Sequence, residues 1–261
     1  MSTVAQTETT HAVILAAGFG SRLAPEEGHK ILAKIGGRSL LDYHLDNFAR
    51  LGVEHLTVVT GYKNEALTEA LESRSLPQGM QLRAAYNADF ESSNGISVLA
   101  GVDAAVEALG ADSALPFWLT MSDHIFDPAL MERIERDFLP VEPGTIEGML
   151  GVDHKLDTIF DMPDANKIAV SNGEFQDIGK ELEVFNLIDV GLFWCGGGFV
   201  EALRAEKAER GDCNTSDAVR RLCAADAFCF WDVGPHLWQD VDTPEARAHA
   251  ERLVVGWSSG E

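Results

Sequence analysis

A glycine-rich segment close to the N-terminus could bind a phosphate group. It reads Leu15-Ala-Ala-Gly-Phe-Gly-Ser-Arg-Leu23, and Lys30 follows seven residues after its end. Glycines have no Cβ atom, so backbone N–H groups at Gly18 and Gly20 could approach phosphate oxygens closely. Arg22 and Lys30 would then supply positive charge to a triphosphate. The segment therefore predicts a nucleotide site.

Two other phosphate-binding motifs do not fit this spacing. A dinucleotide fingerprint would need its third glycine at position 23, which is Leu23. The P-loop spacing of glycines, lysine and serine or threonine is also absent. The remaining alternative is a plain strand-to-loop turn that uses two glycines. The cations that follow the loop favour the nucleotide site over that turn.

Three aspartates stand where predicted elements end. Asp123 directly follows a predicted buried strand, at the edge of a sheet where a ligand would lie, although an aspartate there could also cap a helix or turn. Asp240 and Asp242 form an Asp-Val-Asp pattern that also fits a metal-binding D-x-D motif. For Asp242, which Thr243 follows, ordinary helix capping is the favoured interpretation.

Hydrophobic patterning predicts the elements that must position these residues. Apolar runs of strand length alternate with helical patterns in the first half, which indicates a parallel sheet with helices on both faces. The predicted strands are 12–17, 56–60, 81–86 and 117–121, and the predicted helices begin at Ser39, 64, 96 and Asp127 or Pro128. Ligands of such sheets bind beyond the carboxyl ends of the strands, which points to the loops after Ala17, Tyr86 and Met121.

The second half reads as antiparallel strands and helices laid against the end of that sheet. Ser171-Asn-Gly173 is a predicted hairpin turn. The predicted strands are 146–152, 167–170, 175–178, 190–194 and 228–233, and the predicted helices are 199–208, 216–225 and one that starts at Pro244. We expect a flexible leader over 1–11 and one domain over 12–261, with a nucleotide-binding half (12–140) and an acceptor-binding half (141–261).

Composition narrows the class of protein. Forty-two acidic residues against 20 lysines and arginines give a net charge of −22. Such a chain is repelled by nucleic acids and by anionic membranes, so we expect neither as a partner, and we consider a salt-rich cytoplasm as a hypothesis. Four cysteines without a C-x-x-C pair suit a reducing compartment, and no signal peptide is recognisable. We therefore expect a cytoplasmic protein.

The chain resembles a known enzyme family. The chain resembles the opening of nucleotidyltransferases over the segment 12–23, at Lys30 and over the segment 35–41. These enzymes join an NTP to a phosphorylated small molecule. Directly before the lysine, where that family usually has proline, this chain has His29. Later landmarks are Ser93-Asn-Gly-Ile-Ser97, Met121-Ser-Asp-His124, Asn166-Lys-Ile168, Ile178-Gly-Lys180, Asp189-Val-Gly191 and Trp238-Gln-Asp-Val-Asp-Thr243. This set looks most like CTP:inositol-1-phosphate cytidylyltransferases. The stretch 87–94 is also similar to cytidylyltransferases for phosphocholine and phosphonates.

The resemblance implies a three-layer α/β/α Rossmann-like nucleotidyltransferase fold, with a mostly parallel mixed sheet and a small antiparallel extension. It implies transfer of CMP from CTP to a phosphorylated or phosphonate acceptor, with Mg²⁺ held by Asp123 and Asp240. The implied catalytic residues are Arg22, Lys30, Asp123 and Lys167. The implied nucleotide-binding residues are Leu15, Ala16, Ala17, Gly18, Gly20, Ser21, Arg22, Lys30, Asn87, Ser93, Asn94 and Gly95. The implied acceptor-binding residues are Ser97, His124, Lys167, Lys180 and Asp189.

Other functions are left open at this point. The acceptor could be a sugar 1-phosphate or phosphocholine. A glycosyltransferase of related architecture would use Asp240-Val-Asp242 and release a nucleoside diphosphate instead of pyrophosphate. A non-catalytic nucleotide sensor is the third alternative. The presence of Arg22, Lys30, Asp123 and Asp240 argues against it, because a protein without catalytic activity could lose any of them. A homodimer is also left open.

Overall fold

A nine-stranded mixed sheet carries the first-half elements in the predicted order. The computed structural model describes residues 9–20, 28–111, 115–137 and 145–259. Strand β1 (His11–Leu15) lies between β4 (His55–Thr60) and β6 (Phe117–Met121), and β5 (Gln81–Tyr86) lies beyond β4. These four strands are parallel. Their carboxyl ends therefore meet at one edge of the sheet.

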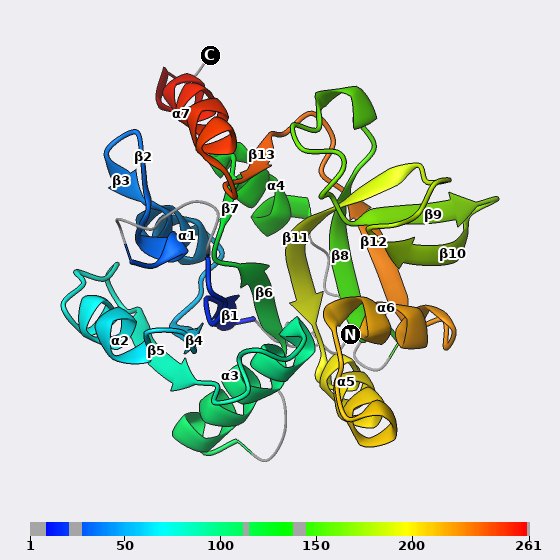
Figure 1. Ribbon diagram of the computed structural model, residues 1–261, viewed down its shortest axis with the longest axis horizontal. Helices are drawn as coiled ribbons and strands as arrows, with labels where there is room; N and C mark the ends of the chain where they lie inside the picture. Colours follow the sequence, from blue (N-terminus) through cyan, green and yellow to red (C-terminus); the bar gives the residue numbers. More distant parts are fainter. Residues whose placement is uncertain (1–8, 21–27, 112–114, 138–144, 260–261) are drawn as a thin grey trace, which may run out of the picture.

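The second half extends this sheet with antiparallel strands. Strand β11 (Leu187–Cys195) pairs antiparallel with β6, with β8 (Gly148–Asp153) and with β9 (Lys167–Ser171). Strand β10 (Glu174–Gly179) pairs with β9, and β12 (Phe228–Asp232) runs parallel to β8. Figure 1 shows these strands to the right of β6 and the first-half strands to its left. The predicted mixed sheet with an antiparallel extension is confirmed.

Helices cover both faces of the sheet, as predicted. Residues of α1 (Leu40–Arg50), α2 (Asn64–Glu72) and α4 (Pro128–Asp137) share one core with Ala12 and Ile14 of β1. Residues of α3 (Asn94–Leu109), α5 (Gly197–Arg210) and α6 (Thr215–Cys223) share the other core with Val13 and Leu15. Because β1 is buried on both faces, its sequence is continuously apolar. The three-layer architecture is confirmed.

Local signals place several element ends. Ser39 caps α1 through a capping box with Asp42, as expected from its hydroxyl. The predicted hairpin turn joins β9 to β10, and both of its central residues, Asn172 (φ 54°) and Gly173 (φ 83°), are left-handed. That conformation is the one a two-residue type I′ loop requires. The Thr243 hydroxyl accepts a hydrogen bond from Ala246 N at the start of α7 (Pro244–Ser259).

Two small ladders at the carboxyl edge of the sheet were not predicted. Strand β7 (His124–Phe126) pairs antiparallel with β13 (Trp238–Asp240). Strand β2 (Lys34–Ile35) pairs with β3 (Arg38–Ser39), and α7 packs beside them in a third apolar cluster that includes Ile35 and Val254. The 3₁₀ turns η1 (Lys30–Leu32) and η2 (Leu156–Thr158) complete the described elements.

The described residues begin within the leader predicted over 1–11. Strand β1 already includes His11, the last residue of the predicted leader, and this residue is buried. Residues 1–8 of that leader and the predicted boundary near residue 140 lie outside the described residues. Of the helices in the described segments, none has the length and apolar character needed to cross a membrane.

Candidate active site

Lys30 is positioned by the loop that follows β1. It opens the turn η1, and its ammonium group lies 2.9 Å from Asp123 Oδ2 and also donates a hydrogen bond to Asp242. Gly20 (φ +57°) lies beside this lysine, since a Cβ on it would contact Lys30 Cβ at 3.4 Å. Burial alone would lower the pKa of Lys30, but the two carboxylates raise it to about 12. The lysine is therefore a fixed positive charge.

Asp123 follows β6 and is held on both oxygens. Its Oδ1 lies 2.7 Å from His124 Nδ1, and its Oδ2 accepts the Lys30 hydrogen bond. Burial opposes ionisation of this carboxyl, yet Lys30 and His124 hold its pKa well below the usual range. The His124 ring stacks on Trp238 with ring centroids 5.9 Å apart. Asp123 is therefore a charged carboxylate with a fixed orientation.

Asp240 reaches the same place through the β7–β13 ladder, where it lies opposite His124. The Gln239 side-chain amide donates to its Oδ1 at 2.9 Å. Burial raises the pKa of Asp240, and the carboxylates of Asp123, Asp242 and Asp161 raise it further, although His124 acts in the opposite direction. A cation between Asp123 and Asp240 would relieve this repulsion.

A cavity of about 460 Å³ opens beside these residues. Its volume suits a small metabolite. Of the predicted site residues, its walls include Asn94, Asp123, His124, Lys180, Asp189 and Asp240. Side chains from both halves of the chain therefore surround one space.

Asp189 lines the cavity near the start of β11. Its Oδ2 accepts a hydrogen bond from Asn166 Nδ2 at 3.0 Å, and its Oδ1 accepts one from Gly191 N at 2.7 Å. Burial raises the pKa of Asp189, and these two donors partly oppose that effect. Gly191 (φ +72°) leaves room for His124, because a Cβ there would lie 2.6 Å from its Nε2.

The two predicted acceptor lysines have different surroundings. Lys167 is only 8% exposed, and its ammonium donates to the carbonyl oxygens of Lys180 (2.5 Å), Ala165 (3.3 Å) and Pro163 (3.5 Å). It is not among the residues that line the cavity. Lys180 lines the cavity and pairs with Asp164 at 2.7 Å. This geometry favours Lys180 as the lysine for the acceptor, although the resemblance implied that Lys167 is the catalytic one, because Lys167 holds backbone carbonyls.

The start of α3 contacts the loop between α5 and α6. Asn94 and Thr215 exchange two hydrogen bonds, of 3.2 and 3.0 Å. The Ser93 hydroxyl donates to Asp212 at 2.7 Å, and a Cβ on Gly95 would lie 2.5 Å from Cys213 O. The predicted nucleotide segment 93–95 is therefore joined directly to the acceptor-binding half.

Two other predicted contact residues bind each other. Asn87 Nδ2 donates to Ser97 Oγ at 3.0 Å, and both side chains are buried. Neither residue lines the cavity. The Ser97 hydroxyl, predicted to contact the acceptor, is instead placed to orient Asn87 at the end of β5.

The glycine-rich loop is tied to the neighbouring strand. Ala16 N donates to Val59 O, and Ala17 O accepts a hydrogen bond from Tyr62 N, each at 2.9 Å. Leu15, Ala16 and Ala17 are buried, whereas Gly18 is exposed. Ser21 and Arg22, both predicted to bind nucleotide, lie outside the described residues.

Sequence reasoning missed several residues of the cavity wall. They share polar side chains and come from the segment before β9 and from α6 with its N-cap residue: Asp161, Asp164, Asn166, Asn214, Thr215, Ser216 and Arg220. One signal was available, because Asn214 with Asp217 forms a capping box three residues apart. That signal marks the start of α6 but says nothing of a ligand.

The described residues contain no group of three or more histidine, cysteine, aspartate or glutamate side chains arranged to hold a metal ion. Asp123 and Asp240 supply two carboxylates from neighbouring strand ends. Mg²⁺ is usually held by one or two carboxylates together with water and substrate phosphates. The two aspartates therefore suit an ion that arrives with a nucleotide.

Comparison with known proteins agrees with this arrangement. Residues 12–143 match the MobA-like NTP transferase domain. The chain belongs to this family. The match begins at β1 and ends beyond α4, so it contains the glycine-rich loop, Lys30 and Asp123 of the NTP transferase domain. The resemblance to nucleotidyltransferases is confirmed.

Several relatives of this NTP transferase cover nearly all of the chain. It is 30% identical, over 97% of its length, to the bifunctional IPC transferase and DIPP synthase of Rubrobacter xylanophilus and 28% identical, over 94%, to that of Aquifex aeolicus. The chain spans about half the length of these relatives, 53% and 51%. It is also 32% identical to the 2-aminoethylphosphonate cytidylyltransferase of Lancefieldella rimae, over 62% of this chain and 60% of that protein.

A solved structure shows the same fold. The inositol-1-phosphate CTP transferase from T. maritima superposes with a TM-score of 0.74 over 98% of both chains, at 22% identity. The α/β fold predicted from the sequence is therefore confirmed by an experimental relative.

Proposed function

We propose that this NTP transferase is a cytidylyltransferase, which moves CMP from CTP to a small phosphorylated or phosphonate acceptor and releases pyrophosphate. One observation carries the proposal: Lys30, Asp123 and Asp242 form a partly buried charged cluster beside a cavity of about 460 Å³ that Lys180 also lines. A polyanion and a second, smaller substrate can meet there.

The residues of the first half would bind the nucleotide. Backbone N–H groups of the loop at Gly18 and Gly20 can approach phosphate oxygens without a Cβ in the way. Lys30, whose pKa is raised to about 12, would add a permanent charge against the triphosphate. Arg22 is proposed for the same task on its sequence position alone. The backbone at Leu15 to Gly18 would contact the base edge.

Asp123 and Asp240 would hold Mg²⁺. The repulsion that raises the pKa of Asp240, and the pair of carboxylates at adjoining strand ends, fit a divalent cation. When bound, the ion would neutralise charge on the nucleotide phosphates. Lys30 contacts both Asp123 and Asp242, so this contact does not decide between Asp240 and Asp242. Asp240 is proposed as the second carboxylate because it pairs with His124 and so lies beside Asp123.

The acceptor would lie in the cavity with its anionic end near Lys180. One of its phosphate or phosphonate oxygens attacks the α-phosphorus of CTP, a new P–O bond forms, and the bond to the β-phosphate oxygen breaks as pyrophosphate leaves. Because the attacking oxygen is already ionised near neutral pH, no strong general base is needed. Catalysis would consist of positioning and charge neutralisation by Lys30 and Lys180.

Two groups of relatives suggest the acceptor. The relatives that match nearly all of this chain, over about half of their own length, are named for IPC transfer and DIPP synthesis, and a shorter match is named for 2-aminoethylphosphonate. We propose an inositol-1-phosphate-like acceptor, because two of those relatives match 97% and 94% of this chain and the phosphonate enzyme matches 62%. The four free cysteines support a reducing, cytoplasmic setting.

A pyrophosphate-release screen tests the proposal. Four NTPs are combined with inositol 1-phosphate, 2-aminoethylphosphonate, phosphocholine and glucose 1-phosphate, each with and without Mg²⁺. We expect release with CTP and inositol 1-phosphate when Mg²⁺ is present. Release of a nucleoside diphosphate in place of pyrophosphate would contradict the proposal.

A further inference from the structure

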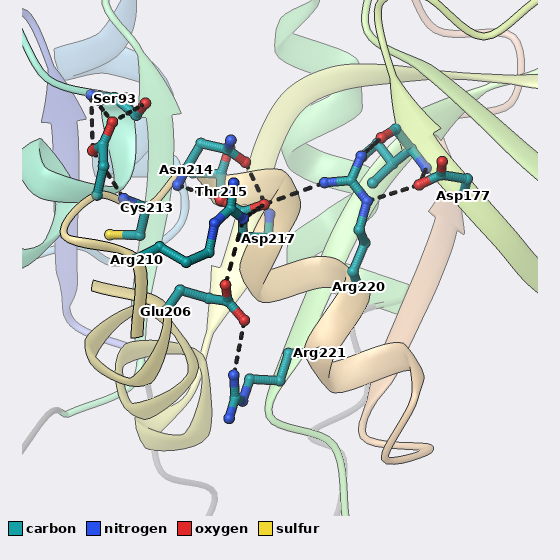
Figure 2. A network of polar contacts seen from close by, with 12 residues as sticks. Ser93, Asp177, Glu206, Arg210, Cys213, Asn214, Thr215, Asp217, Arg220 and Arg221 are labelled. Atoms are coloured by element: carbon teal, nitrogen blue, oxygen red, sulfur yellow. Dashed lines mark hydrogen bonds and ion pairs between the residues drawn. The ribbon is translucent and has the colours of Figure 1, made fainter. Parts of the chain in front are cut away.

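Arg220 connects the cavity wall to an edge hairpin. It lies on α6, lines the cavity, and reaches β10 with its guanidinium group (Figure 2). Its Nε donates to Asp177 Oδ1 at 2.7 Å, its Nη2 donates to the Ile178 carbonyl, and its Nη1 lies 3.3 Å from Asp217 Oδ1. The guanidinium group therefore makes two hydrogen bonds to β10 and one within α6.

The hairpin that Arg220 contacts carries Lys180. Strands β9 and β10 form the edge of the sheet, and β9 is paired with β11 at two register positions, Leu187↔Ile168 and Ile188↔Lys167. A Cβ built on Gly179, the last residue of β10, would lie 3.7 Å from Arg220 Nη2. Arg220 thus lies directly against the backbone that leads into Lys180.

The third hydrogen bond of Arg220 is made to the first turn of α6. Asp217 accepts from Arg220 and also closes the capping box with Asn214. Asn214 and its neighbour Thr215 line the cavity. Arg220 is therefore bonded to Asp217 in the first turn of α6, beside one part of the cavity wall, and to the strand that leads into Lys180.

We propose that Arg220 is a positioning residue for the acceptor: its guanidinium holds β10 against α6, so that Lys180 stays at the cavity wall. The inference rests on the proposed function, because it assigns Lys180 to the acceptor's anionic group. A planar fork with several donors can satisfy a carboxylate and a carbonyl together, whereas a lysine ammonium cannot reproduce that geometry. The arrangement of donors, more than the charge, is what positions the hairpin.

The adjacent arginine is a matched control. Arg221 is on the same helix and equally exposed, at 41%, but it pairs with Glu206 and Glu209 of α5. Figure 2 shows its contact with Glu206. Arg221 is not among the residues that line the cavity. Arg221→Gln removes a charge and two ion pairs from α6 without touching the hairpin.

Steady-state kinetics of Arg220→Gln, Arg220→Lys and Arg221→Gln test the proposal. We expect Arg220→Gln to raise the acceptor KM about tenfold or more, with the CTP KM within about twofold of the wild-type value. Arg220→Lys should not restore the acceptor KM, and Arg221→Gln should match the wild type. An unchanged acceptor KM in Arg220→Gln, or full restoration by Arg220→Lys, overturns the proposal.

Hydrogen exchange separates this inference from the proposed function. Amides of β9 and β10 should exchange faster in Arg220→Gln than in Arg221→Gln, while amides of β1 and β4 should be unchanged. If the wild-type enzyme releases no pyrophosphate with any acceptor, the proposed function fails, and the exchange rates alone decide whether Arg220 holds the hairpin. Asp177→Asn, which removes the hairpin's side of the contact, provides the same test should Arg220→Gln not fold. Unchanged exchange in both variants overturns the proposal.

Discussion

Lys30 Nζ lies 2.9 Å from Asp123 Oδ2, although 93 positions separate the two residues in the chain. The sheet explains the approach, because β1 and β6 are parallel neighbours and Leu15 is in register with Met121. The loops that leave these two strands must therefore begin side by side. The contact places the ammonium group of Lys30, which follows the glycine-rich loop, beside the carboxylate that is proposed to hold the metal.

Replacing Lys30 tests its role at the triphosphate. We expect Lys30→Met to reduce kcat/KM for CTP by about 10²–10³-fold, because the variant loses a charged donor aimed at the phosphates. Lys34→Met, which changes an exposed lysine four residues away, should keep wild-type kinetics. Far-UV circular dichroism would establish that both variants are folded. Wild-type turnover by a folded Lys30→Met enzyme would contradict the assignment.

The two aspartates of the Asp-Val-Asp segment should have separable effects. Asp240→Asn is expected to raise the Mg²⁺ concentration for half-maximal activity about tenfold or more, because an amide is a weaker ligand. Asp242→Asn should leave that concentration near the wild-type value and raise the CTP KM, since Lys30 loses one of its two carboxylates. A titration of Mg²⁺ at saturating CTP distinguishes them. The reverse pattern would make Asp242 the metal ligand.

The strands of the fold could be predicted because their signals are local. The continuous apolar run at β1 and the Asn172-Gly173 turn depend on neighbours within a few residues. The β7–β13 ladder could not be predicted, because each strand has three residues and more than 100 positions lie between them. Its register nevertheless decides where Asp240 stands. The sequence therefore suggested Asp123 and Asp240 as metal ligands, which remains a proposal, but not the ladder that brings them together.

On the acceptor side of the cavity, several contacts could not be predicted from sequence patterns. Lys167 and Lys180 flank the same hairpin, and spacing cannot tell which one turns toward backbone carbonyls. Arg220 carries no local signal, because an arginine on an amphipathic helix is usually solvated. Asn166, which joins Asp189 to Ser216, depends on three segments meeting in space.

Substitutions of Lys167 and Lys180 should have different effects on acceptor binding and on the free energy of unfolding. Lys180→Met is expected to raise the acceptor KM and to change the free energy of unfolding by less than about 1 kcal/mol, since its ion pair with Asp164 is half exposed. Lys167→Met should lower the free energy of unfolding by about 1–3 kcal/mol, because buried carbonyls lose their donor. Urea unfolding and acceptor kinetics measure the two effects. If the acceptor KM rises in a stably folded Lys167→Met variant and not in Lys180→Met, Lys167 and not Lys180 binds the acceptor.

His11 gives a pH-dependent contribution to stability. Burial, with smaller contributions from Arg83 and His55, lowers its pKa from 6.5 to about 4. The unfolded chain binds a proton at this residue below pH 6.5 while the folded chain does not, so stability falls as the pH drops toward 4. Between pH 7 and pH 5 this residue should cost about 2 kcal/mol. The loss measured by urea unfolding should shrink by that amount in His11→Asn, and an equal loss in both proteins would contradict the buried neutral state.

The most direct test of the central claim is the fate of oxygen atoms in the acceptor. Inositol 1-phosphate labelled with ¹⁸O in its phosphate is incubated with CTP, Mg²⁺ and the enzyme, and the products are analysed by mass spectrometry. We expect a CDP-linked product that keeps every labelled oxygen and a pyrophosphate that contains none. Labelled inorganic phosphate, or a free nucleoside diphosphate, would show that the acceptor oxygen does not attack the α-phosphorus.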